Sequence, residues 1–473
     1  MLKKPRQFII VLSFITTLVI GGCAPLGVTP LTPQPSFTPE LSRATSTPIM
    51  VPTPNGPEFG VDPADLNELQ IEFLHPWTGG VLDELTGMVD EFNQTNEWGI
   101  HVIMSAPGSA AMVTGKTREG IANKQPPNVL AAPSSFLLAV DKKEGLVVDL
   151  APYIESQAYG LTEEVVIDFT PYFWNALMVD GKRVGIPAQE SAVLLAYNTT
   201  WAKELGLNGL PDTPEKFRTQ MCSANASFLK DADTTNDGLG GLLVNNDPVA
   251  IYSWLMAYGL GFNLNPDEGY VFSGEAGEAA FNFLLDLKSD SCAWVGRPSQ
   301  DFAYFGNRQA LAIAIWLQDL PTLARELERT GSEDEWTVIP FPGSADQVAA
   351  TGGTAFAVLQ NDPAQDMAAW LFVRWLSQPA QQLRLLEYFG TLPVSETGEQ
   401  AIIELAATPQ LITALKYKDL WLHQPVDADW MAISLVLEDA GWQLLKTEIT
   451  PEMVPSLLQE MDALAEDLVE RNP

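Results

Sequence analysis

Basic residues are scarce in this chain of 473 residues, which has 26 Lys and Arg against 60 Asp and Glu and a formal net charge of −34. A protein that binds nucleic acid needs clustered Lys and Arg to displace phosphate counterions. The composition therefore excludes nucleic acid as a partner and is typical of the acidic, solvated surface of an exported protein.

Histidine is also scarce, with His75, His101 and His423 at no paired spacing, so a histidine metal site is not expected. No frame of the acidic run "DADTTNDG" gives the glycine and glutamate positions of a calcium loop. No glycine-rich phosphate loop follows a strand, and no G-x-S-x-G motif is present. The abundant carboxylates could supply a glycosidase pair, but nothing singles two of them out. We expect no metal, no cofactor and no enzymatic activity.

The first residues resemble an export signal. Lys3, Lys4 and Arg6 precede an apolar run, 8–20, that is too short to span a bilayer comfortably. The run leads through Gly21 and Gly22 into Cys23, as in a lipoprotein box. We predict that residues 1–22 are a signal peptide and that Cys23 is lipidated, which anchors the protein outside the cytoplasm on the cell membrane. An uncleaved anchor helix is the alternative.

Proline alternates with threonine, serine and small residues after Cys23, so residues 23–66 are expected to form an extended tether without a core. Only two further cysteines, Cys222 and Cys292, are present. An oxidising compartment allows them to form a disulfide. Two buried free thiols are the alternative.

The rest of the chain begins with a β-α-β pattern, with strands alternating around residues 69–73 and 100–104 and a helical spacing at 81–92. Strands that alternate with helices predict an α/β fold with parallel sheets covered on both faces. "VGIPAQESAVLLAYN", residues 184–198, reads as a strand that is interrupted and then resumed. The segment from residue 396 onward reads as helical throughout. "LPDTPEKF" predicts a helix start with Asp212 as its cap.

Aromatic and short polar residues recur where the predicted strands end, which is where open α/β sheets bind ligands. Packing residues of the core or its rim are the alternative for each aromatic. The residues at these positions are His75, Trp77, Thr78, Ser134, Ser135, Glu190, Ser191, Trp316 and Gly353.

Several stretches together resemble the family 1 extracellular solute-binding proteins of ABC importers, a carbohydrate-type group that includes maltose- and glycerol-3-phosphate-binding proteins. The resemblance covers residues 67–473. It rests on the order and spacing of "IEFLHPWTGG", "GKRVGIPAQESAVLLAYNTTWAKELGL", "FGNRQALAIAIW", "ATGGTAFAVLQ" and "FGTLPVSE".

The resemblance implies a two-lobe fold of the type II periplasmic-binding-protein kind, with a ligand cleft between the lobes. "GIPAQES" is similar to the first crossover of that fold, where the chain passes from one lobe to the other. Lobe 1 would comprise residues 67–187 and 337–392, and lobe 2 residues 188–336 and 393–473.

The resemblance also assigns ligand-binding roles to the strand-end residues named above and adds Trp430, in "DADWMAISL", as an aromatic that faces the cleft. Aromatic rings suit the apolar face of a pyranose, and short polar side chains suit its hydroxyl groups. "LAAPSSF" lacks the aromatic and acidic residues that maltose-binding members carry there, so maltodextrin itself is not the expected ligand.

The implied function is a monomeric receptor that delivers a sugar or polyol to the transmembrane subunits of an ABC permease. A ligand-binding sensor of a signalling system is one alternative. A surface lipoprotein that degrades glycans is another, and it would need a pair of carboxylates facing the cleft.

Overall fold

A computed structural model describes residues 58–261, 269–297, 299–404, 408–445 and 448–471. Cys23, the signal segment and most of the expected tether therefore lie outside the described residues. The folded part begins earlier than residue 67. The short helices η1 (Glu58–Gly60) and η2 (Pro63–Leu66) lie in the stretch assigned to the tether, and Val61 and Leu66 are buried in the core.

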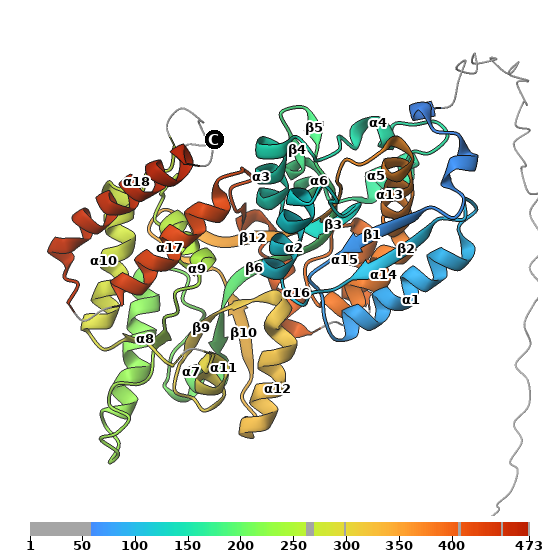
Figure 1. The fold of residues 1–473 in the computed structure, drawn as a ribbon. Helices are drawn as coiled ribbons and strands as arrows, with labels where there is room; N and C mark the ends of the chain where they lie inside the picture. The colour runs from blue at the N-terminus through green and yellow to red at the C-terminus, as the bar shows by residue number, and fades with distance from the viewer. Residues whose placement is uncertain (1–57, 262–268, 298, 405–407, 446–447, 472–473) are drawn as a thin grey trace, which may run out of the picture. The chain divides into compact units, whose positions relative to one another are not determined.

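The first part of the fold has the expected β-α-β organisation. Strand β1 pairs in parallel with both β2 and β3, and α1 lies along β2 (Figure 1). Helix α2 begins where the hydroxyl of Ser109 accepts a hydrogen bond from the amide of Met112 at 3.2 Å. The elements are β1 (Gln70–Leu74), α1 (Gly80–Thr95), β2 (His101–Ser105), α2 (Ala110–Ala122), β3 (Val129–Ala132) and α3 (Ser134–Glu144).

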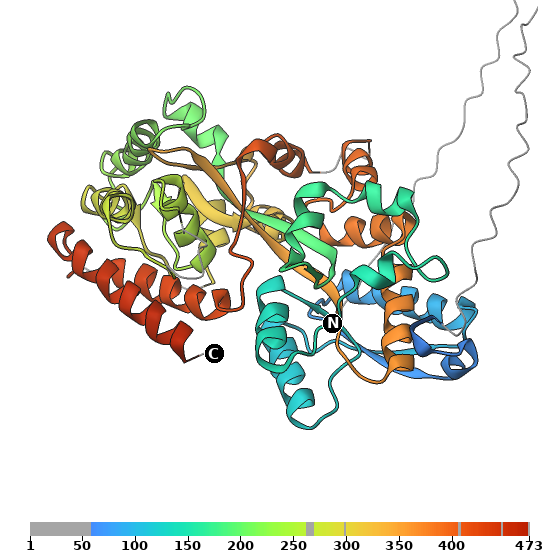
Figure 2. The same cartoon turned by 90° about the horizontal axis from the view of Figure 1, so that it is seen from above.

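Three short helices and a hairpin lead to the longest strand of the fold. They are α4 (Ala151–Ile154), α5 (Glu163–Asp168), α6 (Pro171–Ala176), β4 (Met178–Val179) and β5 (Lys182–Arg183), followed by β6 (Ile186–Asn198). The predicted interruption of β6 is wrong. Residues 187–191 stay extended because they pair with the antiparallel strand β12 (Gln347–Val358), which satisfies their backbone groups. Figure 2 shows β6 and β12 running side by side.

Strands β6 and β12 connect two groups of strands within one sheet. The second half of β12 pairs with β3, and the second half of β6 pairs with β9 (Ala312–Trp316) and β10 (Trp336–Ile339). The sheet therefore continues through β6 and β12 in the order β2-β1-β3-β12-β6-β9-β7-β8.

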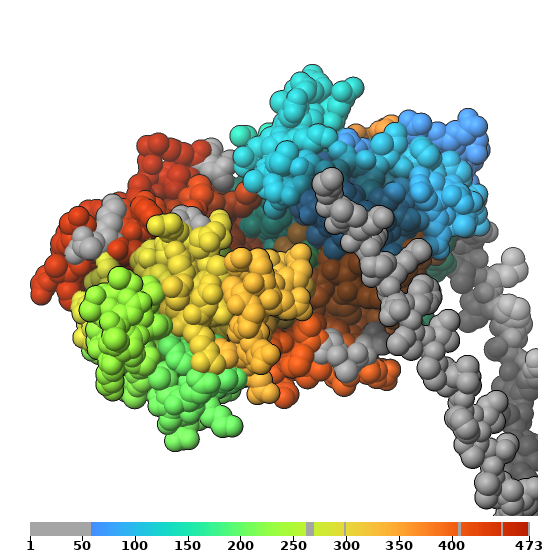
Figure 3. Space-filling model, turned by 90° about the horizontal axis from the view of Figure 1, so that it is seen from below, coloured from blue at the N-terminus to red at the C-terminus, as the bar shows by residue number. Residues whose placement is uncertain are grey.

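The middle of the chain is mostly helical. Figure 3 shows this part from below, with the green residues of α7 and α8 beside the yellow residues of α10 and α11. Thr213, and not the predicted Asp212, caps α8, because its hydroxyl accepts the Lys216 amide at 3.3 Å. The elements are α7 (Thr199–Glu204), α8 (Pro214–Phe228), β7 (Leu242–Leu243), α9 (Pro248–Ala257), α10 (Glu275–Ser289), β8 (Ala293–Trp294), α11 (Asp301–Gly306), β9 (Ala312–Trp316), η3 (Leu317–Asp319), α12 (Leu320–Thr330), β10 (Trp336–Ile339) and β11 (Phe341–Pro342).

The last part is helical with one exception. Strand β13 (Trp421–His423) pairs in parallel with the first half of β12, so the prediction of helix throughout is wrong at these residues. Helices α10, α17 and α18 pack side by side (Figure 1). The elements around β13 are α13 (Pro363–Leu376), α14 (Pro379–Phe389), α15 (Glu396–Glu404), α16 (Pro409–Leu415), η4 (Lys418–Leu420), α17 (Trp430–Leu444), η5 (Pro451–Met453) and α18 (Val454–Glu470).

Buried side chains form four clusters, and these divide the described chain into two groups. Two clusters contain mainly residues before 189 and residues 355–394. The other two contain mainly residues 192–350 and residues after 391. The fold therefore has two hydrophobic centres, joined by β6 and β12.

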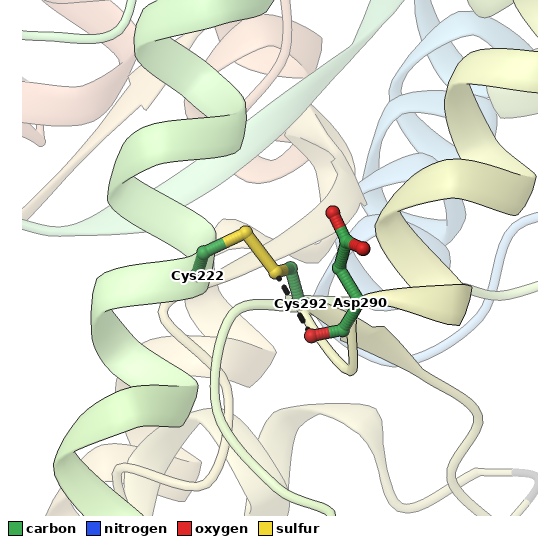
Figure 4. A group of neighbouring side chains, drawn as sticks. All are labelled: Cys222, Asp290 and Cys292. Carbon is green, nitrogen blue, oxygen red and sulfur yellow. Dashed lines mark hydrogen bonds between the residues drawn. A yellow bond between two sulfur atoms is a disulfide. The ribbon is translucent and has the colours of Figure 1, made fainter.

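Cys222 of α8 and Cys292, next to β8, form a disulfide (Figure 4). Asp290 lies beside them, and these three side chains are the one group of potential metal ligands found close together in the described part of the chain. Both sulfurs are used in the disulfide bond, so the group is structural. Among the described helices, none combines the length and the apolar character needed to cross a membrane.

Candidate functional site

A cavity of 470 Å³ lies where loops from both groups of clusters meet the crossing strands β6 and β12. Its volume is within the range of about 300–1,000 Å³ that is typical of small-molecule sites. The loops after β1, β3, β9 and β13 and the start of α17 complete its wall. The lining residues used below are Trp77, Pro133, Ser134, Ser135, Gln189, Glu190, Ser191, Trp316, Gln318, Thr351, Gly352, Gly353, Thr354, His423, Gln424 and Trp430.

Three tryptophans line this cavity from three different segments, and each indole N–H already has an acceptor. Trp77 donates to Gln189 at 2.7 Å, Trp316 to Asp247 at 3.1 Å, and Trp430 to Gln424 at 3.0 Å. The hydrogen bonds fix the orientation of the rings. The indoles therefore offer apolar ring surface to an occupant and no free donor.

The crossing strands form the floor of the cavity, and glycine is needed where they meet. A Cβ on Gly353 would lie 1.9 Å from the backbone oxygen of Gln189 and 2.8 Å from the carboxyl carbon of Glu190. A Cβ on Gly352 would lie 1.9 Å from the side-chain nitrogen of Gln424. Gly353 allows the backbone of β6 to approach β12 closely, and Gly352 leaves room for the side chain of Gln424.

Glu190 lies on this floor with its carboxyl group against Gly353 and is 9% exposed. Burial raises the pKa of Glu190 to about 8, because the charged form loses its hydration. Next to it, the hydroxyl of Ser191 is buried without a hydrogen-bond partner among the described residues. Both residues line the cavity.

Among the described residues that line the cavity, His423 is the one with an imidazole ring. The ring stacks on Tyr172 at 3.8 Å between centroids, and its Nε2 lies 3.0 Å from the Tyr172 carbonyl oxygen. The other nitrogen, Nδ1, lies 3.4 Å from the Thr351 hydroxyl. Burial lowers the pKa of His423, so the ring is neutral near pH 7 and donates from Nε2 to the carbonyl.

The structure brings most of the predicted site residues together. Eight of the ten line the cavity: Trp77, Ser134, Ser135, Glu190, Ser191, Trp316, Gly353 and Trp430. Ser134 and Ser135 begin helix α3 behind Pro133, which provides no side-chain cap.

The other two predicted residues, His75 and Thr78, do not line the cavity. His75 is fully buried between Phe73 and Trp77, at centroid distances of 5.0 and 5.4 Å. Burial lowers the pKa of His75 to about 4. Thr78 is exposed and does not line the cavity. His75 is therefore a core residue that supports Trp77.

Sequence reasoning missed several polar residues of the cavity, namely Gln189, Gln318, Thr351, Thr354, His423 and Gln424. Gln189 lies within the quoted "GIPAQES" stretch, next to two predicted residues, and could have been found there. His423 and Gln424 were missed because the segment around β13 reads as helix.

A family model described as "Bacterial extracellular solute-binding protein" matches residues 87–414, which is more than half of the chain. No curated protein matches the sequence.

Solved structures share the fold at low sequence identity. The cyclic alpha-maltosyl-1,6-maltose binding protein from Arthrobacter globiformis is 18% identical, with a TM-score of 0.70 over 85% of this chain and 99% of that one. The sugar-binding protein MalE from Xanthomonas citri is 18% identical, with a TM-score of 0.70 over 85% and 98%. The maltotriose-binding protein of Thermus thermophilus is 18% identical, with a TM-score of 0.64 over 84% and 100%. The two-lobe α/β architecture is thus the one found in these binding proteins.

Proposed function

Because this chain belongs to the family of bacterial extracellular solute-binding proteins, we propose that it is a receptor that binds a sugar or polyol and delivers it to an ABC permease. The observation that carries the proposal is the cavity at the crossing of β6 and β12, with three indole rings and several short polar side chains in its wall. Aromatic surface suits the C–H faces of a pyranose ring, and serine, threonine and glutamine suit its hydroxyl groups.

The ligand contacts in this proposal are the eight lining residues that the sequence indicated, together with Gln189, His423 and Gln424. Structures with the same fold were solved with cycloalternan, for a protein from Listeria monocytogenes, and with maltotriose, for a domain from Bdellovibrio bacteriovorus. These ligands belong to those proteins, and they support a saccharide as the class to test first.

The proposed lobes are residues 67–187 with 337–392 and residues 188–336 with 393–473, with the cavity between them. The division into two groups of buried clusters supports this assignment. The boundary at residue 337 fits the sheet less well than the others. Strand β10 is assigned almost wholly to lobe 1, yet it pairs with the second half of β6, which is assigned to lobe 2. Outside the described residues, lipidated Cys23 would anchor a monomeric receptor to the membrane next to its permease.

A binding role fits the cavity better than glycan hydrolysis. Hydrolysis needs a pair of carboxyl groups on the two sides of the glycosidic bond. Glu190 is the one carboxyl-bearing side chain among the described residues that line the cavity. The sensor alternative has no structural observation in its favour.

A thermal-shift screen tests the proposal. A ligand that binds only the folded state raises Tm, because it stabilises that state by RT ln(1 + [L]/Kd). The panel comprises neutral and substituted mono-, di- and oligosaccharides together with glycerophosphodiesters, and calorimetric titration follows for each compound that raises Tm. We expect at least one saccharide to raise Tm and to bind with one-to-one stoichiometry. If no saccharide in the panel raises Tm, the sugar-receptor proposal is overturned.

A further inference from the structure

The described side chains that line the cavity include no cation. Among its described lining residues there is no Lys or Arg, and His423 is held neutral by burial. Its one acidic residue, Glu190, forms no hydrogen bond or ion pair through its carboxyl group with any described residue. A buried carboxylate without a partner is unfavourable, because the hydration it loses is not replaced. The described lining residues provide no cation for the Glu190 carboxyl group, so a cationic partner would be part of the ligand.

More carboxyl groups lie behind Trp316. A smaller cavity of 160 Å³ on that side is lined by Asp247, Asp301 and Asp319. Burial and the neighbouring Asp247 raise the pKa of Asp319, and burial raises that of Asp301. No basic residue is among the described residues that line this second cavity. The wall that holds Trp316 therefore repels an anionic ligand.

The wall at the start of α3 has the reverse polarity. The first amide groups of α3, at Ser134 and Ser135, have no acceptor within the helix and lie at its positive end. Such groups suit the oxygen atoms of hydroxyls. A ligand that fits this cavity has hydroxyl groups towards the start of α3 and a positive charge beside Glu190 on the floor.

We infer that the ligand is an amino sugar, or an oligosaccharide that contains one, whose ammonium group pairs with the carboxylate of Glu190 while its hydroxyl groups face the start of α3. This inference rests on the proposed function and specifies the ligand class of the same site. The indole faces of Trp77, Trp316 and Trp430 fit both parts of such a molecule. Aromatic rings attract ammonium groups and also pack against pyranose C–H groups.

Binding of an ammonium group should release a proton, whereas binding of a neutral sugar should not. Burial raises the pKa of Glu190 to about 8, so the carboxyl group of the empty site is protonated below that pH. When the ammonium group binds, the carboxyl proton leaves to solvent and an ammonium–carboxylate pair forms. The titratable groups that face Glu190 are Tyr172 of α6 and His423 of β13. Both stay neutral near pH 7, so the released proton comes from Glu190.

A matched set of saccharides tests the inference. Glucose, N-acetylglucosamine and glucosamine differ at one ring position, as do the corresponding β-1,4-linked disaccharides. Calorimetric titrations at about pH 6.5, where the ligand amine is charged, use two buffers of different ionisation enthalpy. We expect the ammonium form of a sugar to bind at least about tenfold more tightly than its neutral analogues. Its binding should release close to one proton per bound ligand.

Glu190→Gln keeps the shape of the side chain and removes its charge. In this variant we expect both the preference for the ammonium form and the proton release to disappear. The control is Glu119→Gln, at an exposed position of α2, which should behave as the wild type, and melting curves verify that both variants are folded.

Neutral saccharides that bind as tightly as the ammonium forms, or ammonium binding without proton release, would overturn the inference and leave the proposed function intact. Failure of all saccharides to bind would overturn the proposed function, and the inference with it.

Discussion

At the scale of single residues, Trp316 differs from the other two indoles of the cavity because it is only partly buried. Trp77 and Trp430 are 8% and 5% exposed and also pack in the core. Trp316 therefore has the most ring surface to offer an occupant, and its removal should separate binding from folding.

We expect Trp316→Ala to weaken ligand binding by about 1–3 kcal/mol, roughly 5- to 150-fold, because it removes a stacking surface. Asp247 keeps its hydrogen bonds to the amides of Val249 and Ala250, so stability should change little. The control is Trp370→Ala. Trp370 is fully buried away from the cavity, and its loss should cost about 3–5 kcal/mol of stability. Calorimetric titration and a melting curve of each variant provide the measurements. Unchanged affinity with a collapsed Tm for Trp316→Ala would mean that the ring is a packing residue.

Glu190 should also make stability depend on pH. The pKa rises from its ordinary value of 4.5 to about 8 in the folded state. The folded state favours the protonated form, so this contribution to stability is present below pH 4.5 and is lost as pH rises towards 8. The stability of Glu190→Gln relative to wild type should therefore increase between pH 4.5 and about 8 and stay constant at higher pH. Urea unfolding of both proteins at about pH 5, 7 and 9 measures the difference. A difference that stays constant across these pH values would contradict the assigned pKa.

Most of the cavity residues could be predicted because they follow strands whose alternation is clear. The same alternation explains the error at His75. Ile71, Phe73, His75 and Trp77 are all buried and lie two residues apart, so His75 continues the inward face of β1. Polarity suggested a ligand contact, whereas the strand period, applied one step further, would have placed the ring in the core.

At the scale of secondary-structure elements, the sequence predicted the β-α-β start but not the continuity of β6. Pro187 and Glu190 are poor strand formers, and they are extended because β12 lies alongside. β12 itself is more than a hundred residues away in the chain. Strand β13 was hidden for a related reason: three residues, Trp421–His423, show too little alternation to be recognised, and their strand conformation comes from pairing with β12. Long-range pairing cannot be read from a local pattern.

The disulfide provides a prediction at this scale. Cys222 and Cys292 are 70 residues apart and connect α8 to the start of β8. In the chain-entropy model, a crosslink that closes such a loop stabilises the fold by about 4 kcal/mol. We expect the double variant Cys222→Ala, Cys292→Ala to lose stability of that order and to keep its ligand affinity, because neither cysteine lines the cavity.

Urea unfolding with and without a reductant measures this contribution. The reductant should destabilise the wild type and leave the double variant unchanged, and peptide mapping without reduction should recover the crosslinked pair. Two free thiols in protein from its native compartment would refute the prediction.

At the scale of the whole molecule, the predicted lipid anchor concerns residues outside the described part of the chain. We expect the mature protein to begin at Cys23 and to carry acyl chains there, because a charged segment, a short apolar run and small residues precede the cysteine. Intact-mass analysis of membrane-extracted protein should give the acylated mass, and Cys23→Ala should release the protein from the membrane fraction. A retained signal with an unmodified thiol would contradict the prediction.

The last prediction concerns closure of the proposed lobes. Strands β6 and β12 join the two groups of buried clusters, and their register shifts between Thr354 and Ala355, next to the floor of the cavity. A shift of this kind interrupts the ladder and lets the strands bend locally, as a hinge of a few residues requires. A ligand can favour a closed form only through contacts that are better in that form than in the open one. Trp77 and Trp316, which belong to different proposed lobes and line one cavity, can provide such contacts.

We therefore expect the radius of gyration, measured by small-angle scattering, to fall when ligand saturates the wild-type protein. Trp316→Ala should require a higher ligand concentration for the same change, because it loses contacts from one lobe. An unchanged radius at saturation in the wild type would mean that the ligand enters a cavity that is already closed, and that β6 and β12 are rigid connections.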